Sequence, residues 1–415
     1  MTQELQARAR AVFAAGVAAA DPAQAVARHL PQALADAPEP GGRWRLIALG
    51  KAAHAMAGAA LAALPRGIPA LVVTTREAAK PLAGAVVLAA GHPVPDAAGE
   101  AAGRAVEAAL TAAMPQDRVL ALISGGGSAL LPTPVPGISL DDKAAVNRLL
   151  LGSGADIGQM NLVRQALSRL KGGGWLRACR APIVALILSD VPGDDLRVIA
   201  SGPTVAALGG RAEAVGLCRA LGLWAALPAA VRAHLASPET AAAELPAARN
   251  LLVGSNALSL AAMQAEGAEL ADFALSGDVG EMAAKIIATL GAMEPGQVLV
   301  AGGETTVRLV GRGLGGRNQE LALRVALAAE AEGLAGDWAF LAGGSDGRDG
   351  PTDAAGAVVG PQTLPAMRRA GIDPAKRLAD NDSYPALAAA GALLFTGATG
   401  TNVADLAVLL RGKEG

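Results

Sequence analysis

The chain has 415 residues, more than a single hydrophobic core usually serves, so we expect two domains. Its formal net charge is −2, and no long run of one charge sign occurs, which argues against a nucleic-acid coat or a polybasic membrane surface. With four Trp, four Phe and one Tyr, the core must be built from Leu, Val, Ile and Ala.

The N-terminal segment, residues 1–21, predicts an amphipathic helix. It lacks the charged-then-apolar layout of a signal peptide, and no apolar stretch approaches the roughly 20 residues that span a bilayer. Two cysteines, Cys179 and Cys218, are too few for a disulfide framework or a thiolate metal site. We therefore expect a cytoplasmic protein with reduced thiols and no membrane partner.

In the first half of the chain, short apolar runs alternate with helical patterns. Such alternation is typical of βαβ units and a parallel sheet. Ser139 and Asp142 resemble a helix N-terminal cap with an acidic first turn. The predicted strands are 43–50, 69–75, 84–91, 118–124 and 181–190, and the predicted helices are 51–64, 96–113 and the interrupted stretch 139–174.

The second half mixes strand types, which predicts a mixed sheet covered by helices. We place the domain boundary near residue 240, giving domains 1–240 and 241–415. The segment 305–310 alternates polar and apolar residues and predicts a half-exposed antiparallel strand. Residues 403–412 could pack on either domain. The other predicted strands are 250–254, 268–275, 297–303, 338–344 and 354–360, and the predicted helices are 279–291 and 318–332.

Glycine-rich polar clusters repeatedly follow the apolar strands. In open parallel sheets, ligands bind outside the carboxyl ends of the strands. Clusters on both halves therefore suggest one cleft between two domains. They are "GKAA" at 50, "GHPVPD" at 91, "SGGGS" at 124, "SDVPGDD" at 189, "GSN" at 254, "GGET" at 302 and "GGSDGRDGPTD" at 343.

The cluster "SGGGS" is a candidate phosphate cradle, because small residues let backbone N–H groups approach an oxyanion and a following helix adds partial positive charge. The alternative is a tight turn where strand and helix pack closely. The phosphate-loop motif G-x-x-x-x-G-K-[ST] does not occur. The cradle residues are Ser124, Gly125, Gly126, Gly127 and Ser128.

Several charged residues are candidates for chemistry. Lys51 begins a predicted helix, where a cation opposes the helix dipole, although a solvated surface lysine is the alternative. Asp190 and Asp194 follow a very apolar strand and suit a hard cation such as Mg²⁺, or a base, or simply a turn. Glu304 raises the same choice. His54, His92 and His234 lack the spacing of a zinc site.

The segment "GRGLGG" at 311–316 matches G-x-G-x-x-G between a predicted strand and helix, which is the context of a dinucleotide site. The preceding strand alternates in polarity, unlike a buried first strand of that fold. A glycine-rich loop that positions Arg317 is the favoured alternative.

The clusters, together with "LSDVPGDDLRVIASGPT", "GGRNQE" and "TGATGTNVADL", occur in an order that resembles the class II glycerate kinases, the glycerate 2-kinase family whose C-terminal half is called the MOFRL domain. The resemblance covers nearly the whole chain. It implies an α/β protein with a Rossmann-like N-terminal parallel sheet, helices on both faces, a C-terminal mixed-sheet α/β domain, and an active site in the cleft between the domains.

The resemblance further implies transfer of the γ-phosphoryl group of ATP to the 2-hydroxyl of D-glycerate, with Mg²⁺. It assigns the family's lysine, aspartate and arginine to Lys51, Asp190 and Arg317. We expect the cradle to hold nucleotide phosphates, with Asn256 as a further nucleotide contact. The candidate Mg²⁺ ligands are Asp190, Asp194 and Glu304. Asp190 could instead orient or deprotonate the 2-hydroxyl.

The expected partners are glycerate and a nucleotide, with no nucleic acid, and a homodimer is one option for assembly. An NAD(P)H-dependent hydroxypyruvate reductase is the alternative, since members of the family carry that label. A non-catalytic binding protein is a third reading. We expect Lys51→Ala and Arg317→Ala each to reduce turnover by orders of magnitude with little loss of stability.

Overall fold

The computed structural model describes residues 2–238, 245–246 and 248–413. The chain divides into two compact units: the first unit is Pro22–Val253, and the second unit is Met1–Asp21 together with Gly254–Gly415. The boundary expected at residue 240 lies outside the described residues. The observed division falls 13 residues later, and it moves residues 1–21 from the first domain to the second unit.

The first unit is built on a six-stranded sheet in the order β3-β2-β1-β4-β5-β6. The pairings of β1 with β2 and β4, of β2 with β3, and of β4 with β5 are all parallel. This is the strand order of the dinucleotide-binding fold, so the Rossmann-like prediction is confirmed. The strands are β1 (Trp44–Leu49), β2 (Ala70–Thr75), β3 (Val86–Ala90), β4 (Arg118–Ile123), β5 (Ile183–Leu188) and β6 (Arg249–Gly254).

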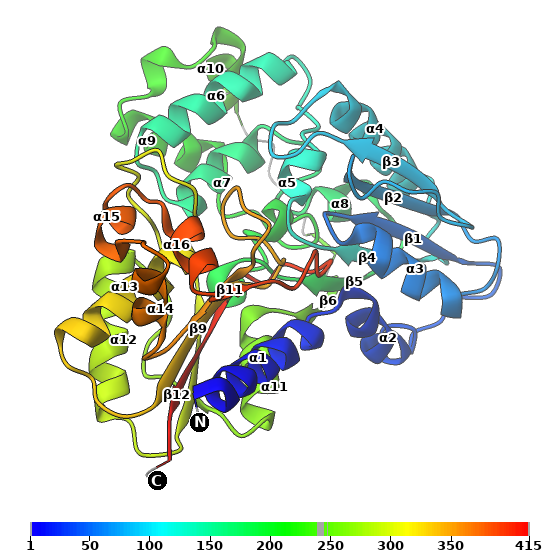
Figure 1. Cartoon of the computed structure of the whole chain (residues 1–415). Coiled ribbons are helices and arrows are strands. Elements are labelled where there is room, and N and C mark those ends of the chain that lie inside the picture. The colour runs from blue at the N-terminus through cyan, green and yellow to red at the C-terminus, as the bar shows by residue number, and fades with distance from the viewer. Residues whose placement is uncertain (1, 239–244, 247, 414–415) are drawn as a thin grey trace. The chain divides into compact units, whose positions relative to one another are not determined.

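Helices cover both faces of this sheet (Figure 1). On one face, α2 (Pro22–Ala33) packs on α3 (Ala53–Ala63). On the other, α4 (Ala97–Thr111) and α8 (Gly174–Ala178) bury Val106, Leu110 and Trp175 against the strands. The short helices α5 (Gly127–Leu130), η1 (Pro192–Asp194) and η2 (Ile199–Ser201) follow β4 and β5.

A separate group of helices in the first unit has its own apolar core, which includes Val146, Val163 and Val231. The predicted cap is confirmed, since Ser139 and Asp142 form a reciprocal capping box at the start of α6. The group consists of α6 (Leu140–Gly152), α7 (Ile157–Ala166), α9 (Arg211–Ala220), η3 (Trp224–Ala226) and α10 (Ala229–Ala236).

The second unit holds a six-stranded mixed sheet in the order β11-β10-β9-β12-β8-β7. Only β7 and β8 pair in parallel among its described pairings. The mixed sheet was predicted correctly. Its strands are β7 (Glu269–Leu270), β8 (Val298–Gly303), β9 (Trp338–Gly344), β10 (Gly356–Val359), β11 (Leu393–Leu394) and β12 (Asp405–Arg411).

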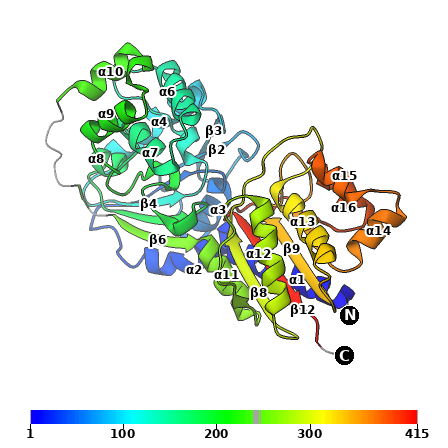
Figure 2. The same ribbon diagram turned by 90° about the vertical axis from the view of Figure 1, so that its left-hand side faces the viewer.

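Helices also cover both faces of the second sheet, as Figure 2 shows. One face carries α12 (Val279–Ala292) and α13 (Arg317–Ala331), and the other carries α1 (Thr2–Ala19) and α11 (Asn256–Ala265). Val12 and Phe13 of α1 are buried against this sheet, which explains why the N-terminal helix belongs to the second unit. Three short helices complete the unit: α14 (Thr363–Arg369), α15 (Pro374–Ala379) and α16 (Ser383–Ala389).

Three strand predictions for the second half need correction. Residues 250–254 form the predicted strand, β6, but it is an edge strand of the first sheet and does not open the second. Residues 305–310 form no strand beyond one bridge from Thr306 to Asp278. The strand predicted at 268–275 is reduced to β7 and one bridge at Leu275. Residues 403–412, for which no strand was predicted, supply β12, a central strand of the second sheet.

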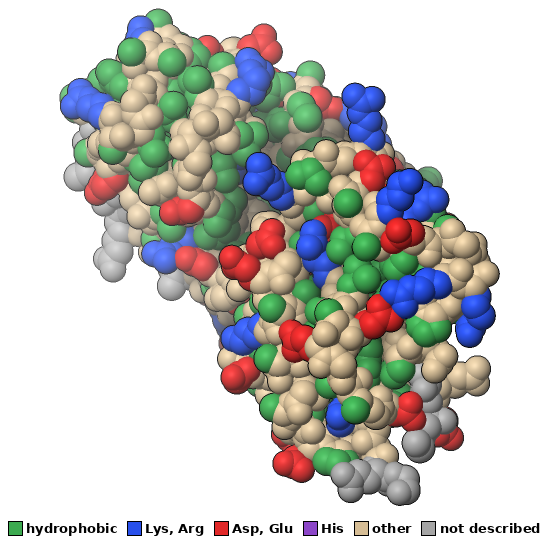
Figure 3. Space-filling view, turned by 60° about the vertical axis from the view of Figure 1, so that its left-hand side comes forward, with side chains coloured by type: hydrophobic (Ala, Val, Ile, Leu, Met, Phe, Trp, Pro, Cys, Tyr) green, Lys and Arg blue, Asp and Glu red, His purple; other side chains and the backbone are tan. Residues whose placement is uncertain are grey.

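The surface matches the near-neutral net charge. On the face drawn in Figure 3, basic and acidic side chains are interspersed rather than gathered by sign. None of the described helices is both long and apolar enough to cross a membrane.

Candidate active site

The carboxyl ends of β1 and β4 form the topological switch point of the first sheet, because the chain turns to opposite sides after these adjacent strands. "GKAA" follows β1, and "SGGGS" follows β4. We call residues Ser124–Ser128 the glycine loop. Two of the predicted clusters thus share the position where ligands bind in this fold.

Backbone hydrogen bonds join the two loops. The N–H of Lys51 donates to the carbonyl oxygen of Gly125 (2.9 Å), and the N–H of Ala52 donates to Ser124 Oγ (3.1 Å). Gly50 has φ +122°, and a Cβ atom there would lie 2.2 Å from Ser124 Oγ. The Ser124 hydroxyl is therefore buried and engaged in holding the loops together, while the side chain of Lys51 is exposed on a fixed backbone.

The three consecutive glycines each make room for something different. A Cβ atom on Gly125 would lie 2.0 Å from Asp190 Oδ2, and one on Gly127 would lie 2.8 Å from the Cβ of Ala200. Gly126 has φ +82° and faces Lys51 and His92. The alternative of close packing thus accounts for Gly127, and the other two glycines let charged side chains approach the loop.

Asp190 follows β5, and its carboxylate lies against Gly125. Burial raises the pKa of Asp190, while its own backbone N–H and the charge of Lys51 act in the opposite direction. The structure therefore brings Lys51 and Asp190 together at the glycine loop. A carboxylate with a raised pKa beside a lysine is suited to accept a proton from a substrate hydroxyl.

His92 is a member of this cluster that the sequence analysis considered only as a zinc ligand. It follows β3, and its ring would lie 3.2 Å from a Cβ atom on Gly126. Burial, assisted by the charge of Lys51, lowers the pKa of His92. The position of "GHPVPD" after a strand was the available signal, since it predicts a side chain at the same edge of the sheet.

Ser128, the last cradle residue, faces a different neighbourhood. Its hydroxyl contacts the hydroxyl of Ser201, which in turn donates to Asn161 Oδ1 (3.0 Å). Its carbonyl oxygen accepts a hydrogen bond from Lys171 Nζ (2.9 Å). A buried lysine thus anchors the end of the glycine loop.

The candidate metal ligands lie in both units. Asp190 and Asp194 belong to the first, where no described hydrogen bond or ion pair with another residue engages the Asp194 carboxylate, and Glu304 belongs to the second. Within the described residues, no three His, Cys, Asp or Glu side chains are placed to hold a metal ion. The carboxylate of Glu304 instead lies 2.5 Å from Arg317 Nη1.

In the second unit, Arg317 is the first residue of α13 and is held by carboxylates. Its Nε and Nη2 donate to Asp405 of β12 (2.5 and 3.0 Å). Asp405 is 1% exposed, whereas the side chain of Arg317 is 35% exposed. Although burial acts against it, the pairing with Asp405 and Glu304 raises the pKa of Arg317. Asp405 was missed by the sequence analysis.

Asp349 completes the acidic surroundings of Arg317. Its carboxylate accepts hydrogen bonds from the backbone N–H groups of Asn318 (3.1 Å) and Gln319 (2.8 Å), at the N-terminus of α13. Burial raises the pKa of Asp349 to about 6, although those two N–H groups lower it. The arginine and the helix start are thus fixed by carboxylates from two other segments.

Asn256 has a structural engagement. Its Nδ2 donates to the carbonyl oxygens of Val403 (2.8 Å) and Asp405 (3.0 Å), and Gly302 leaves room for its Oδ1. Asn256 therefore fixes the start of β12, which carries the partner of Arg317. These bonds engage its amide N–H groups, and the nucleotide contact expected of Asn256 stays a prediction.

The segment 311–316 is pinned by the loop before α16. Asn381 Oδ1 accepts from the N–H groups of Val310 (2.8 Å) and Gly311 (2.9 Å). Asp380 and Asp382 accept from the next N–H groups of the loop. A dinucleotide site would need such N–H groups for its pyrophosphate, and here carboxylates stand in that place.

Comparisons with known proteins agree with this architecture. Residues 8–236 match a family model described as "Domain of unknown function (DUF4147)", and residues 297–405 match the MOFRL family. A "Glycerate 2-kinase" of Pyrococcus horikoshii is 38% identical over 90% of this chain and 89% of its own length. A "Putative hydroxypyruvate reductase" of Agrobacterium vitis is 43% identical over 97% of this chain and 94% of its own length.

Among solved structures, the "Glycerate kinase" of Thermotoga maritima superposes with a TM-score of 0.90 at 35% identity, covering 99% of this chain and 100% of that one. The fold is thus that of a two-domain α/β protein with a Rossmann-like sheet and a MOFRL domain. The chain belongs to the class II glycerate kinase family with a C-terminal MOFRL domain.

Proposed function

We propose that this protein is an ATP-dependent glycerate 2-kinase, which converts D-glycerate and ATP to 2-phosphoglycerate and ADP. The observation that carries the proposal is the position of both Lys51 and Asp190 at the glycine loop, at the switch point of a Rossmann-like sheet. Two relatives named glycerate kinases, one of them a 2-kinase, support the choice of substrate.

In the proposed reaction, Asp190 accepts the proton of the 2-hydroxyl group of glycerate. The hydroxyl oxygen then bonds to the γ-phosphorus of ATP, and the bond to the β,γ-bridging oxygen breaks, leaving its electron pair on ADP. Lys51 stabilises the negative charge on the transferring phosphoryl group. Because Gly125 and Gly126 lack side chains, Asp190 and Lys51 can lie close to the loop on which the phosphoryl group would be held.

We assign Arg317 as a second cation of the same reaction, with Asp405 and Glu304 fixing its orientation. A fixed guanidinium suits the planar carboxylate of glycerate. Loss of Arg317 should therefore weaken glycerate binding as well as turnover.

Mg²⁺ enters the proposal as part of the MgATP substrate. The ion usually keeps several waters and takes one or two protein carboxylates besides the phosphates. Asp194 is the candidate carboxylate, since none of the described ion pairs occupies it. We place the reaction in the cytoplasm, where ATP is available.

The alternative is an NAD(P)H-dependent hydroxypyruvate reductase, and the name of the Agrobacterium relative supports considering it. Carboxylates already accept hydrogen bonds from N–H groups of its expected cofactor loop, 311–316, which argues against cofactor binding there. The reductase predicts NADH oxidation with hydroxypyruvate, and the kinase predicts none.

The test is ADP formation from MgATP and D-glycerate, with the product passed to enolase without a mutase. Enolase accepts the 2-phosphate only, so immediate phosphoenolpyruvate supports a 2-kinase. ADP without phosphoenolpyruvate indicates a 3-kinase or another acceptor. No ADP, together with NADH oxidation on hydroxypyruvate, would replace the kinase by the reductase.

A further inference from the structure

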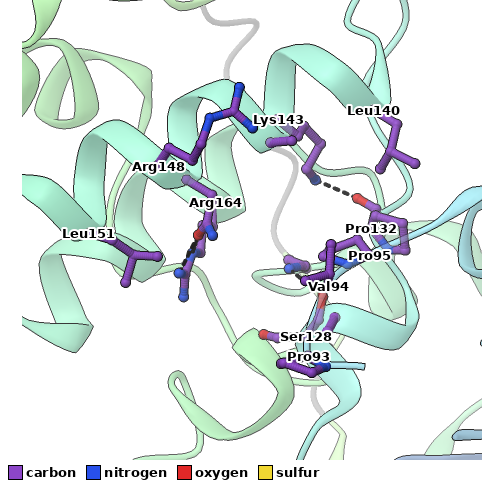
Figure 4. Close-up of a pocket in the computed structure, with 14 residues that line it drawn as sticks. Pro93, Val94, Pro95, Ser128, Pro132, Leu140, Lys143, Arg148, Leu151 and Arg164 are labelled. Carbon is purple, nitrogen blue, oxygen red and sulfur yellow. Dashed lines mark hydrogen bonds between the residues drawn. The ribbon is translucent and has the colours of Figure 1, made fainter. Parts of the chain in front are cut away.

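A cavity of about 430 Å³ opens in the first unit between the helices α6 and α7 and the loops that follow β3 and β4 (Figure 4). Its basic lining residues are Lys143, Arg148, Arg164 and Lys171. Among the residues that line it in the described part of the chain, none is Asp or Glu. The cavity is thus a concentration of positive charge without a carboxylate.

The two lysines are held facing the loops. Lys171 is 6% exposed, and its Nζ donates to the carbonyl oxygen of Ser128 (2.9 Å). Lys143 Nζ donates to the carbonyl oxygens of Pro132 and Leu167 (3.2 Å for Leu167), and Figure 4 shows its contact with Pro132. An ammonium group has three N–H donors, so both lysines retain donors beyond these described bonds.

The absence of an acidic partner from the lining has an energetic consequence. Burial, with the nearby charge of Arg164, lowers the pKa of Lys171 to about 7, and burial lowers the pKa of Lys143 well below its usual value. Arg164 has the neutral amide of Asn147 as its partner (3.0 Å from Nε). Buried cations without a counter-charge are costly, and a bound anion would offset that cost.

A purely structural role explains part of this arrangement. Lys143 and Lys171 hold loop carbonyl oxygens in place, but neutral donors could do so without the cost of a buried charge. Moreover, Arg148 is exposed and has no partner among the described contacts. Holding the loops together therefore does not account for four cations around one cavity.

We propose that this cavity binds the polyphosphate chain of a nucleotide, with its four basic lining residues Lys143, Arg148, Arg164 and Lys171 as the phosphate contacts. The inference rests on the proposed function, which requires a nucleoside triphosphate as phosphoryl donor. The volume lies in the usual range for small-molecule sites. Val94, Leu140 and Leu151 give the cavity an apolar wall suited to the base and ribose.

The glycine loop connects this cavity to Lys51. Ser128 lines the cavity, while a Cβ atom on Gly126, two residues earlier, would lie 3.1 Å from Lys51 Cγ. A polyphosphate chain in the cavity would therefore direct its terminal phosphoryl group along the glycine loop toward Lys51 and Asp190. The phosphates of the donor would then lie beside the glycine loop and contact the lysine and arginine side chains of the cavity.

The test is calorimetric titration of the full chain with ADP, comparing wild type with Arg148→Gln and Arg164→Gln. A charge-assisted contact to phosphate corresponds to roughly a tenfold change in affinity, so we expect each variant to weaken ADP binding by about tenfold or more. Arg66→Gln is the control, because Arg66 is exposed in the loop before β2, at the amino end of the strands. It should bind ADP as wild type does. Pyrophosphate should compete with ADP, and adenosine should not.

Two outcomes would overturn the inference. The first is unchanged ADP affinity in both variants while wild type binds ADP. The second is that both variants keep the wild-type KM for ATP and have a raised KM for D-glycerate. This result would mean that the cavity binds the acceptor and not the nucleotide. The enolase-coupled assay tests the proposed function separately. Weakened ADP binding without kinase activity would remove the function and keep the nucleotide site. Retained fold in each variant is checked by circular dichroism.

Discussion

Replacing Arg317 by Met should destabilise the protein, because the arginine neutralises a carboxylate that water does not reach. Asp405 is 1% exposed and receives two hydrogen bonds from Arg317. Removing one partner of a buried ion pair costs roughly 3–5 kcal/mol. Since the Arg317 side chain is 35% exposed, solvent screens part of the interaction, and we expect about 2–3 kcal/mol. The sequence analysis expected little loss of stability.

The measurement is urea unfolding at pH 7, followed by circular dichroism, for Arg317→Met, Asp405→Asn and the double variant. Asn at position 405 is uncharged, so the double variant contains no unpaired buried carboxylate. Its stability should return to within about 1 kcal/mol of wild type. Lys51→Met serves as the control, because the described residues offer its exposed side chain no ion pair.

If Arg317→Met were as stable as wild type, this reasoning would be refuted. The result would mean that the Asp405 carboxylate can be buried without a cationic partner at no cost. A double variant as unstable as Arg317→Met would refute it too, by assigning the loss to packing. The double variant also separates two roles of the arginine. If it is stable but inactive, the loss of turnover reflects the reaction and not the fold.

Four further predictions concern the other charged groups. Lys51→Met should lower kcat at least about 100-fold in the enolase-coupled assay, without a shift in Tm, since it removes charge stabilisation in the transition state. Gly125→Ala should abolish turnover while Gly67→Ala, at an open turn with φ +78°, costs only stability, because a Cβ on Gly125 would collide with Asp190. The pKa of Asp349 lies at about 6, above its unfolded value. Its contribution to stability is therefore present at low pH and is lost as the pH rises through 6. In Asp349→Asn, the fall of Tm between pH 4 and 7 should be smaller by this contribution. Because the pKa of Lys171 is about 7, that lysine is largely neutral at pH 8. A bound polyphosphate would favour its charged form, so ADP binding at pH 8 should be accompanied by proton uptake. Calorimetric titrations in two buffers of different ionisation enthalpy measure this uptake, which should be smaller in Lys171→Met.

Five of the six strands of the first sheet could be predicted from the sequence, because each is a short apolar run bounded by glycine or a helical pattern; β6 was predicted as a strand but placed in the second domain. The strand predicted at 305–310 is absent, and the alternation of polar and apolar residues gives no sign of the reason. The side chain of Asn381, 71 residues from Val310, accepts the N–H group that a partner strand would need. Residues 403–412 look like a strand, but only the completed second sheet shows that they pair with both β8 and β9.

Within the candidate site, Lys51 and Asp190 could be predicted because each directly follows a strand of the parallel sheet. The partner of Arg317 could not, because Asp405 lies 88 residues away in a strand that was not assigned. The basic cavity escaped the sequence analysis for a different reason. Lys143 and Arg148 lie on helix α6, where charged residues usually form a solvated face, and only tertiary packing brings them to one cavity with Arg164 and Lys171.

The two cations of the proposed reaction differ in how much of their charge is available. Arg317 is surrounded by Asp405, Glu304 and Asp349, so its local environment is net negative. Lys51 has no ion pair among the described residues, and its charge acts on the carboxylate of Asp190. We therefore propose that Lys51 supplies most of the positive charge for the transferring phosphoryl group. Arg317, with a fixed orientation and a partly exposed guanidinium, is better suited to orient a carboxylate.

Loss of Lys51 should thus act chiefly on kcat, while Arg317→Met paired with Asp405→Asn should act chiefly on the KM for glycerate. The opposite pattern would exchange the two roles.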